Sequence, residues 1–232
     1  SDRIGHVLAA HEQGAAHAAD GYARASGKTG VVLATSGPGA TNLVTGIANA
    51  YLDSVPMVAI TGNVAVNSLG KDSFQEVDIA GITIPITKHN FFVSRVEDIA
   101  ECIREAFNIA RSGRPGPVLV DVPKDLMVKL CEYTPETPAP PAEPPELFTE
   151  ADINALAESI NKAERPLIYA GGGVITAKAS DKLVKLAEKA DIPVVSTLMN
   201  LGAIPRDHKL SLGMVGMHGS KEANQAVYNS DL

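Results

Sequence analysis

Short apolar runs alternate with stretches of helical spacing along most of the chain. Three runs in the first half are rich in β-branched residues and bounded by glycine or proline: VVLATS (31–36), VPMVAITG (55–62) and PVLVDVP (117–123). We predict them as strands, and we predict helices at residues 12–26, 40–53 and 96–111. Apolar strands that alternate with helices indicate a parallel sheet covered on both faces.

The second half continues the pattern with PLIYAG (166–171) and PVVST (193–197), which flank a helical stretch at 177–190. The opening HVLAA (6–10) is also predicted as a strand, and another is expected to begin in the last residues, 228–232. The chain is therefore predicted as α/β, with two doubly wound parallel-sheet domains that bind ligands at the carboxyl ends of their strands. We expect the natural gene product to be longer at both ends.

Residues 134–148 break the alternation. The segment reads TPETPAPPAEPPELF, with six prolines, three glutamates and no basic residue. Such a composition favours an extended, polyproline-like linker. The predicted domains are therefore 1–133 and 149–232, and the second, at about 84 residues, is short for a complete doubly wound domain.

Charge and cysteine content exclude several classes of partner. Among 232 residues, 27 are acidic and 20 are basic, and the net charge is −7. A nucleic-acid partner held through its phosphates favours the opposite balance, so none is expected. Cys102 and Cys131 stand in no metal-binding spacing and indicate a reducing compartment. No apolar stretch reaches the roughly 18–20 residues that span a bilayer. We therefore expect a cytoplasmic protein without a membrane partner.

Three familiar motifs are matched only in part. Gly27-Lys28-Thr29 lacks the first glycine of a phosphate loop, because residue 22 is tyrosine, and it ends a predicted helix instead of opening one. The two histidines of HEQGAAH (11–17) are six positions apart, which does not place two zinc ligands on one helical face. The triplets at 37–39 and 171–173 lack the third glycine of a dinucleotide fingerprint.

Polar residues gather where the predicted strands end. Glu12 closely follows the strand predicted at 6–10, and Pro38 and Asn42 lie in TSGPGATN (35–42), at the end of the next strand. Ligand-binding groups collect at such junctions, and glycine lets a ligand approach the backbone. An acid in the first helical turn also suits the helix dipole, and a Gly-Pro-Gly turn also serves packing alone. The residues by themselves leave both interpretations open.

A second set of candidates has the same ambiguity. Phe74 and Gln75 lie in a polar stretch after the strand at 55–62, and Lys124 follows the strand at 117–123. An aromatic wall, a neutral hydrogen bonder and a cation suit a substrate site. A loop anchor and a solvated lysine are the commoner roles of such residues.

Cofactor-binding candidates lie on both sides of the linker. Arg114, in the stiff turn SGRPGP, can present its guanidinium to a phosphate or stabilise the end of a helix. Gly171, Gly172 and Gly173 leave bare backbone N–H groups after a strand, or simply make a turn. The methionine-containing stretch 214–219 suits either a cofactor or ordinary packing.

Taken together, these stretches resemble a known family. HEQGAAHAADGYARASGKTGVVLATSGPGATNLVTGIANAY (11–51) is similar to the pyrimidine-binding domain of thiamine-diphosphate enzymes. Four other stretches extend the resemblance to the catalytic subunits of acetolactate (acetohydroxyacid) synthases: LGKDSFQEVDIAGIT (69–83), TKHNFFV (87–93), GRPGPVLVDVPKD (113–125) and LGMVGMHG (212–219). The resemblance covers nearly the whole chain, as most of the pyrimidine-binding domain and part of a Rossmann-like central domain.

The resemblance implies a catalytic role for Glu12. In this family the matching glutamate hydrogen-bonds the aminopyrimidine ring of thiamine diphosphate and so drives removal of the thiazolium proton. Pro38 and Asn42 would line the pyrimidine pocket. Because the carboxyl must donate a hydrogen bond, we expect water-poor surroundings, rich in alanine and glycine, to raise its pKa towards about 6–7.

The resemblance also implies roles for the other candidates. Phe74, Gln75 and Lys124 would line the substrate channel. FAD, which takes no net part in the redox balance, would bind the central domain through Arg114, Gly171, Gly172, Gly173, Thr197, Leu198, Met217, His218 and Gly219. Family members bind Mg²⁺ and the diphosphate at a Gly-Asp-Gly…Asn motif. This sequence has no such motif, so no metal ligand is predicted here and the metal site is expected in a further C-terminal domain.

The implied reaction is a carboligation. Pyruvate loses CO₂, and its two-carbon remainder joins a second 2-keto acid to give 2-acetolactate or 2-aceto-2-hydroxybutyrate for branched-chain amino acid biosynthesis. A homodimer or homotetramer is implied, because each active site of the family forms between two subunits, and a regulatory small subunit can accompany it. We expect the 232-residue piece alone to be inactive. The alternatives are a pyruvate oxidase or decarboxylase, and a non-catalytic nucleotide-binding relative.

Overall fold

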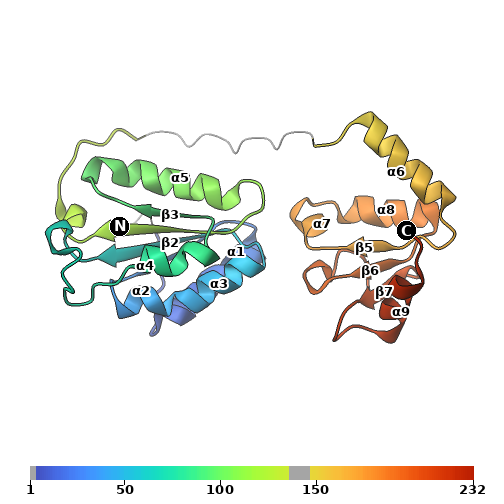
Figure 1. Cartoon of the computed structure of the whole chain (residues 1–232), viewed down its shortest axis with the longest axis horizontal. Helices are drawn as coiled ribbons and strands as arrows, with labels where there is room; N and C mark the ends of the chain where they lie inside the picture. The colour runs from blue at the N-terminus through green and yellow to red at the C-terminus, as the bar shows by residue number, and fades with distance from the viewer. Residues whose placement is uncertain (1–3, 136–146) are drawn as a thin grey trace. The chain divides into compact units, whose positions relative to one another are not determined.

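The computed structural model describes residues 4–135 and 147–232. They belong to two compact units, Ser1–Pro144 and Pro145–Leu232. In Figure 1 the first unit runs from blue to green, and the second from yellow to red. Most of the predicted linker 134–148 lies outside the described residues, which resume at Leu147. The domain limits 1–133 and 149–232 therefore stay predictions.

The first unit is built on a four-stranded parallel sheet. Its strands are β1 (Gly30–Ala34), β2 (Met57–Asn63), β3 (His89–Phe92) and β4 (Pro117–Pro123). Their spatial order is β1-β2-β4-β3, and Met57 lies opposite both Gly30 and Pro117 in register. The strands predicted at 31–36, 55–62 and 117–123 are confirmed as β1, β2 and β4.

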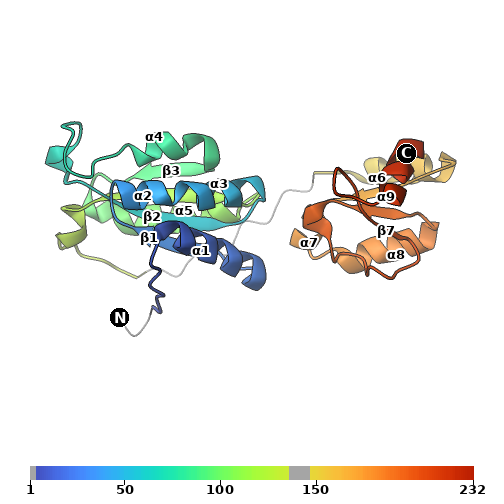
Figure 2. The ribbon, with the colours of Figure 1, turned by 90° about the horizontal axis from the view of Figure 1, so that it is seen from below.

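Helices cover both faces of this sheet (Figures 1 and 2). They are α1 (Glu12–Ser26), α2 (Pro38–Asn42), α3 (Val44–Leu52), α4 (Ile79–Thr83) and α5 (Ile99–Arg111). Successive residues of β2 point to opposite faces: Met57 and Ala59 join the core of α1 and α3, whereas Val58 joins the core of α5. The doubly wound arrangement is therefore confirmed here. The helix predicted at 40–53 is divided at Leu43.

Small residues bring α1 and α3 into close contact. A Cβ on Gly46 of α3 would lie 2.4 Å from the Cβ of Ala16, which is fully buried in α1. The buried carboxylate of Asp20 accepts a hydrogen bond from Asn49 at 2.9 Å and joins the same two helices. These contacts fix the direction of α1, and thereby the position of Glu12 at its first residue.

The second unit holds a smaller parallel sheet. Its strands β5 (Ile168–Ala170), β6 (Val194–Ser196) and β7 (Ser211–Met214) are adjacent in that order, and β5 and β6 confirm the strands predicted at 166–171 and 193–197. The helices are α6 (Glu150–Lys162), α7 (Gly173–Thr176), α8 (Ser180–Ala190) and α9 (Lys221–Asn229). Helices α8 and α9 lie on opposite sides of the sheet (Figure 2).

Short 3-10 turns lie in the connections of both units: η1 (Val66–Ser68), η2 (Ile84–Ile86), η3 (Val96–Asp98), η4 (Leu126–Val128) and η5 (Leu198–Asn200). The helix predicted at 96–111 therefore opens with η3. The helix predicted at 177–190 begins at Ser180 as α8. Within residues 4–135 and 147–232, no helix has both the length and the apolar character needed to cross a membrane.

Two predicted strands are wrong. Residues 6–10 form no strand, and Val7 and Leu8 are 94% and 92% exposed. A strand needs a neighbour to take up its backbone hydrogen bonds, and no described strand pairs with this segment. At the other end, Tyr228 and Asn229 belong to α9 instead of opening a strand. The residues after α9 return to the start of β5, where the N–H of Leu167 donates to the carbonyl of Leu232 at 2.9 Å.

Candidate active site

A cavity of about 670 Å³ lies where β1, β2 and β4 end. Residues 33–36 and 60–65 supply two of its walls, residues 73–75 a third, and Lys124 lies at the end of β4. Parallel strands present their carboxyl ends at one edge of the sheet, which is where this architecture binds ligands. The cavity therefore lies where the predicted fold places a site.

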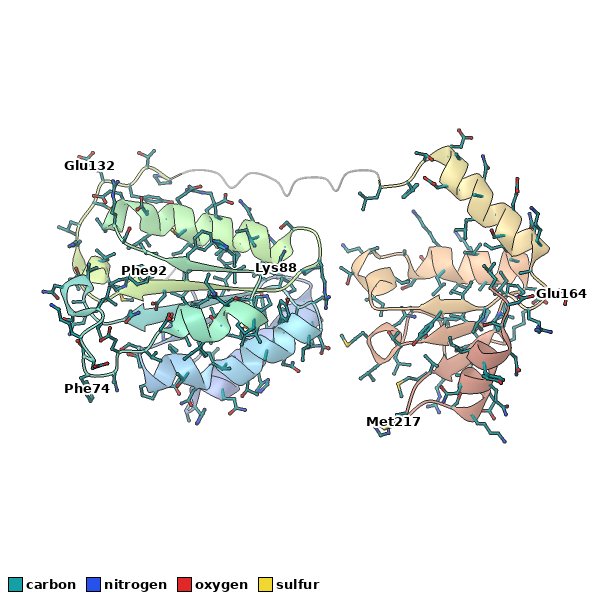
Figure 3. The ribbon with its side chains drawn as sticks, in the orientation of Figure 1. Phe74, Lys88, Phe92, Glu132, Glu164 and Met217 are labelled. Carbon is teal, nitrogen blue, oxygen red and sulfur yellow. The ribbon has the colours of Figure 1, made fainter. Side chains whose placement is uncertain are left out.

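All three residues predicted to bind substrate line this cavity. Phe74 is 89% exposed, and its side chain points away from the body of the unit (Figure 3). Lys124 directly follows β4, and its backbone N–H donates to the carbonyl of Asn63 at 3.0 Å. The fold therefore brings side chains from segments about 50 residues apart in sequence to one cavity.

Gln75 lies against the glycine turn that follows β1. Gly37 has φ +62°, and a Cβ there would fall 2.8 Å from the carbonyl oxygen of Gln75. Glycine is needed at this position for both the backbone conformation and the close approach. The contact joins the turn predicted to bind the cofactor to the residues predicted to bind substrate.

Glu12 and Asn42 form a hydrogen-bonded pair beside the same turn. Asn42, the last residue of α2, donates through Nδ2 to Oε2 of Glu12 at 3.0 Å. A Cβ on Gly39 would lie 2.7 Å from Cγ2 of Thr35 and 3.4 Å from Oε1 of Glu12. Pro38 occupies the first position of α2, immediately before Gly39. The structure thus brings Glu12 to the turn that holds both other residues predicted for the pyrimidine pocket.

The expected protonation of Glu12 is wrong for the described chain. Its pKa is lowered, chiefly because the amide of Asn42 hydrogen-bonds the carboxylate, and also because a backbone N–H does so. Burial, which would raise the pKa, has the smaller effect. The alanine- and glycine-rich composition of α1 serves its packing against α3, and it leaves the carboxyl of Glu12 partly exposed to water.

A buried polar network beside the cavity was not anticipated from the sequence. Asp121 of β4 is 1% exposed, and its carboxylate accepts hydrogen bonds from Thr61 Oγ1 at 2.7 Å and from Asn63 Nδ2 at 2.5 Å. Burial raises the pKa of Asp121, and the two hydrogen bonds oppose this change. Thr61 and Asn63 also line the cavity. A single charged residue inside the apolar run PVLVDVP was the available signal.

Arg114 belongs to the first unit, but it is not among the residues that line the cavity. Its Nε donates to Oγ of Ser54 at 2.7 Å, and Nη2 donates to the carbonyl of Leu52 at 3.2 Å. Leu52 is the last residue of α3, so these contacts are those of a helix-end cation, one of the two interpretations left open by the sequence. Contact with FAD stays a prediction.

The cofactor candidates of the second unit lie along one edge of its sheet. Gly171–Gly173 follow β5, Thr197 and Leu198 follow β6, and Met217–Gly219 follow β7. These strands are adjacent and parallel, so their carboxyl ends share an edge. Leu198 and Met217 are 67% and 91% exposed, and Met217 projects from the unit (Figure 3).

Close packing requires glycine at some positions along this edge and not at others. A Cβ on Gly172 would lie 3.0 Å from the Cβ of Met199, and one on Gly219 would lie 2.3 Å from the carbonyl oxygen of Met214. Packing therefore favours glycine at both. A Cβ on Gly171 or Gly173 would meet no heavy atom within 4 Å. Packing within the unit gives no reason for these two glycines, whereas a ligand lying on the backbone would.

Metal ligands do not gather at either edge. Within residues 4–135 and 147–232, no group of three or more histidine, cysteine, aspartate and glutamate residues is arranged to hold a metal ion.

Known proteins match both units. Residues 1–82 match the family described as the N-terminal TPP binding domain of thiamine pyrophosphate enzymes, and residues 153–232 match the family described as their central domain. An acetolactate synthase of Mycobacterium leprae is 53% identical over 100% of this chain and 37% of its own length. A probable acetolactate synthase large subunit of Methanocaldococcus jannaschii is 52% identical over 98% of the chain and 39% of its own length.

A third relative comes from Escherichia coli. Its acetolactate synthase isozyme 1 large subunit is 50% identical over 100% of the chain and 41% of its own length. The chain thus spans about two fifths of the length of the curated relatives it matches.

Proposed function

Because the chain belongs to the thiamine pyrophosphate enzyme family, we propose that it is part of the catalytic subunit of an acetolactate synthase. The enzyme would decarboxylate pyruvate and join the remaining two carbons to a second 2-keto acid, giving 2-acetolactate or 2-aceto-2-hydroxybutyrate. The observation that carries the proposal is one arrangement: the Glu12–Asn42 pair and the cavity of Phe74, Gln75 and Lys124 meet at the same glycine turn.

The residues around Glu12 fit thiamine diphosphate. Gly37 and Gly39 carry no side chains, and beside them Glu12 and Asn42 supply a carboxyl and an amide that suit the nitrogen atoms of an aminopyrimidine. When bound, the cofactor supplies a nucleophilic carbon that adds to the carbonyl of a 2-keto acid and allows release of CO₂. Glu12 would exchange a proton with the ring, and Asn42 would hold the carboxyl in place.

The lowered pKa of Glu12 bears on how a complete site works. A carboxyl that donates a proton near neutrality needs less water around it than Glu12 has in this chain. We propose that the active enzyme is a homodimer or homotetramer in which a second subunit covers Glu12. Loss of water would then raise its pKa, opposing the hydrogen bond from Asn42. The 232-residue chain alone would be inactive.

The cavity suits a small 2-keto acid. Lys124 supplies a cation for the substrate carboxylate, and Gln75 supplies an uncharged hydrogen-bonding group. Phe74 provides an apolar surface for the methyl or ethyl group of the acceptor. We therefore propose these three side chains as substrate-binding residues. Phe74 would select between pyruvate and 2-ketobutyrate as the acceptor, because it contacts the group in which they differ.

FAD and magnesium complete the proposed cofactor set. The bare backbone at Gly171 and Gly173, beside the exposed Leu198 and Met217, fits a flat ligand that lies along the edge of the second sheet. Thr197, Gly172, His218 and Gly219 would be further contacts, with Arg114 toward a phosphate. The reaction consumes and produces no electrons, so FAD would have a structural role. Mg²⁺ with the diphosphate would bind outside this chain.

The cellular setting follows the same proposal. Acetolactate and acetohydroxybutyrate lead to valine and isoleucine, so we propose a role in branched-chain amino acid biosynthesis. The relatives named large subunits make a regulatory small subunit a partner to seek. Cys102 and Cys131 form no disulfide, which agrees with a reducing, cytoplasmic location.

Product analysis of the full-length enzyme tests the proposal. The enzyme is incubated with pyruvate, thiamine diphosphate, Mg²⁺ and FAD, and acetolactate is measured. Acetolactate that depends on thiamine diphosphate is the expected result. Acetaldehyde would indicate a decarboxylase, and acetyl phosphate would indicate an oxidase. No loss of pyruvate at all would favour a non-catalytic nucleotide-binding protein.

A further inference from the structure

The loop that carries Phe74 and Gln75 contains unfavourable backbone conformations. Gly70, Asp72 and Gln75 have φ values of +70°, +51° and +59°. The left-handed region is open to glycine, but it costs Asp72 and Gln75 about 1 kcal/mol or more each. Such conformations persist only where neighbouring contacts hold them, so the loop requires an internal restraint.

Glu76 provides that restraint through both of its carboxylate oxygens. Oε2 accepts the N–H of Ser73 at 2.8 Å, and Oε1 accepts the N–H of Gly70. The N–H of Glu76 in turn donates to the carbonyl of Ser73 at 2.9 Å. These bonds close residues 70–76 into a ring around one carboxylate. Phe74 lies within this ring, between Ser73 and Glu76, which are bonded to each other.

The charge of Glu76 suits this role. Hydrogen bonds from the N–H groups of Ser73 and Gly70 lower the pKa of Glu76, so the carboxylate is ionised at neutral pH. Lys71 lies in the same loop, but its Nζ donates to the carbonyl of Asn67 at 2.6 Å. The carboxylate therefore acts on the loop backbone, and Glu76 is not among the residues that line the cavity.

The closed loop determines the positions of Phe74 and Gln75 at the cavity. Gln75 is held with its backbone against Gly37, where no larger residue fits. Phe74, the preceding residue, is exposed and lines the cavity. If the ring of hydrogen bonds opened, Asp72 and Gln75 could relax to ordinary φ values, and both Phe74 and Gln75 would leave these positions.

We propose that Glu76 is a positioning residue for the 2-keto acid site: its carboxylate closes the loop of residues 70–76 and so presents Phe74 and Gln75 to the substrate. The substrate part of this inference rests on the function proposed above. Glu76 itself touches neither substrate nor cofactor.

A fluorescence experiment tests the loop without using activity. The chain has no tryptophan, so Phe74→Trp creates a single reporter in the loop. Glu76→Gln keeps the size of the side chain, but it turns an NH₂ donor toward a backbone N–H. We expect the steady-state anisotropy of the introduced indole to fall in the Glu76→Gln background. Glu76→Asp should give an intermediate value, and Glu132→Gln, at an exposed position on the segment after η4, should leave it unchanged.

A kinetic experiment with the full-length enzyme separates positioning from general stability. Glu76→Gln should raise KM for pyruvate about 5–20-fold with a melting temperature close to that of the wild type, because substrate contacts are misplaced while the core is intact. A lowered melting temperature with unchanged KM would make Glu76 a merely structural residue. Unchanged anisotropy in the reporter protein would also overturn the proposal.

The two experiments distinguish the two possible failures. If the wild-type enzyme consumes no pyruvate, the proposed function fails, while the anisotropy comparison still decides whether Glu76 holds the loop. If the enzyme is active and Glu76→Gln behaves like Glu132→Gln in both experiments, the proposed function stands and the role of Glu76 does not.

Discussion

The two sheets of this chain end in edges of different character. At the edge of β1, β2 and β4, polar side chains are bonded to one another: Glu12 is bonded to Asn42, and Asp121 is bonded to Thr61 and Asn63. At the edge of β5, β6 and β7, the candidates are bare glycines and exposed apolar groups such as those of Leu198 and Met217.

The difference indicates two ways of building a binding site. The first edge holds its functional groups in place before any ligand arrives, which suits catalysis, because proton transfer depends on fixed geometry. The second edge offers backbone and soft side chains, which suits a cofactor whose own surface completes the packing.

The largest effect is expected at Glu12. In the full-length enzyme, Glu12→Gln should lower the turnover number about 100-fold or more, because the amide cannot exchange the proton that the cofactor requires. The fold should remain intact, since an amide can still form a hydrogen bond with Asn42 after rotation. Acetolactate formation and circular dichroism measure the two effects, with Glu132→Gln as the control. Near-wild-type turnover in Glu12→Gln would refute a catalytic role.

A pair of glycine substitutions should separate the two edges. Gly37→Ala should destabilise the protein by about 1–3 kcal/mol, because it combines a left-handed backbone with a clash against Gln75. Gly173→Ala meets open space and lies at the start of α7, so stability should be unchanged or slightly higher. Urea unfolding measures both.

The same pair tests the cofactor assignment. Gly173→Ala should weaken the binding of FAD in the full-length enzyme, as measured by flavin fluorescence, although its fold is unaffected. Equal flavin affinity in Gly173→Ala and the wild type would remove Gly173 from the proposed site. A stable Gly37→Ala would show that the turn after β1 is less constrained than its contact with Gln75 indicates.

The smallest effect is a change in pH dependence at Asp121. Burial raises the pKa of this carboxyl above its ordinary value, so the folded protein binds a proton that the unfolded chain has already released. The contribution of Asp121 to stability is therefore present at low pH. It is lost as the pH rises from the ordinary pKa of the unfolded chain through the raised pKa of the folded protein. Asp121→Asn does not titrate, so the wild type should lose melting temperature relative to it over that window.

The control for this measurement is Asp207→Asn, at an exposed position in the second unit. Groups with lowered pKa values, such as Glu76 and Asp152, contribute less to the stability of the protein as the pH falls. These groups are common to all three proteins, so their contributions cancel in the difference. A wild-type minus Asp121→Asn difference that does not change with pH would mean that the hydrogen bonds of Thr61 and Asn63 cancel the effect of burial on the pKa of Asp121. A difference that increases as the pH rises would mean that they outweigh it.

Local patterns predicted most of the regular structure. The helix at 12–26 and the strand at 117–123 have the predicted bounds, because an apolar run or a helical spacing is complete within each segment. The failure at residues 6–10 has the opposite cause. Val7 and Leu8 have the composition of a strand, but a strand also needs a paired neighbour, and composition does not specify one.

The candidate site divides in the same way. The residue types at 12, 42, 74, 75 and 124 and their positions after predicted strands could be read from the sequence, together with the family they resemble. The buried network of Asp121 and the restraint by Glu76 were missed. Asp121 binds a residue 60 positions away, and the loop of Glu76 is held by bonds to backbone groups that no composition reveals.

By itself, the sequence determined the alternation of strands and helices, the small residues of α1 and the chemical groups available at each strand end, because these depend on neighbours along the chain. Only the tertiary structure decided that Asn42 lowers the pKa of Glu12, that Gln75 closes against Gly37, and that Phe74, Gln75 and Lys124 share one cavity. The physical reason is distance in sequence: charge stabilisation, close packing and enclosure act between atoms in contact, and the fold brings those atoms together from segments tens of residues apart.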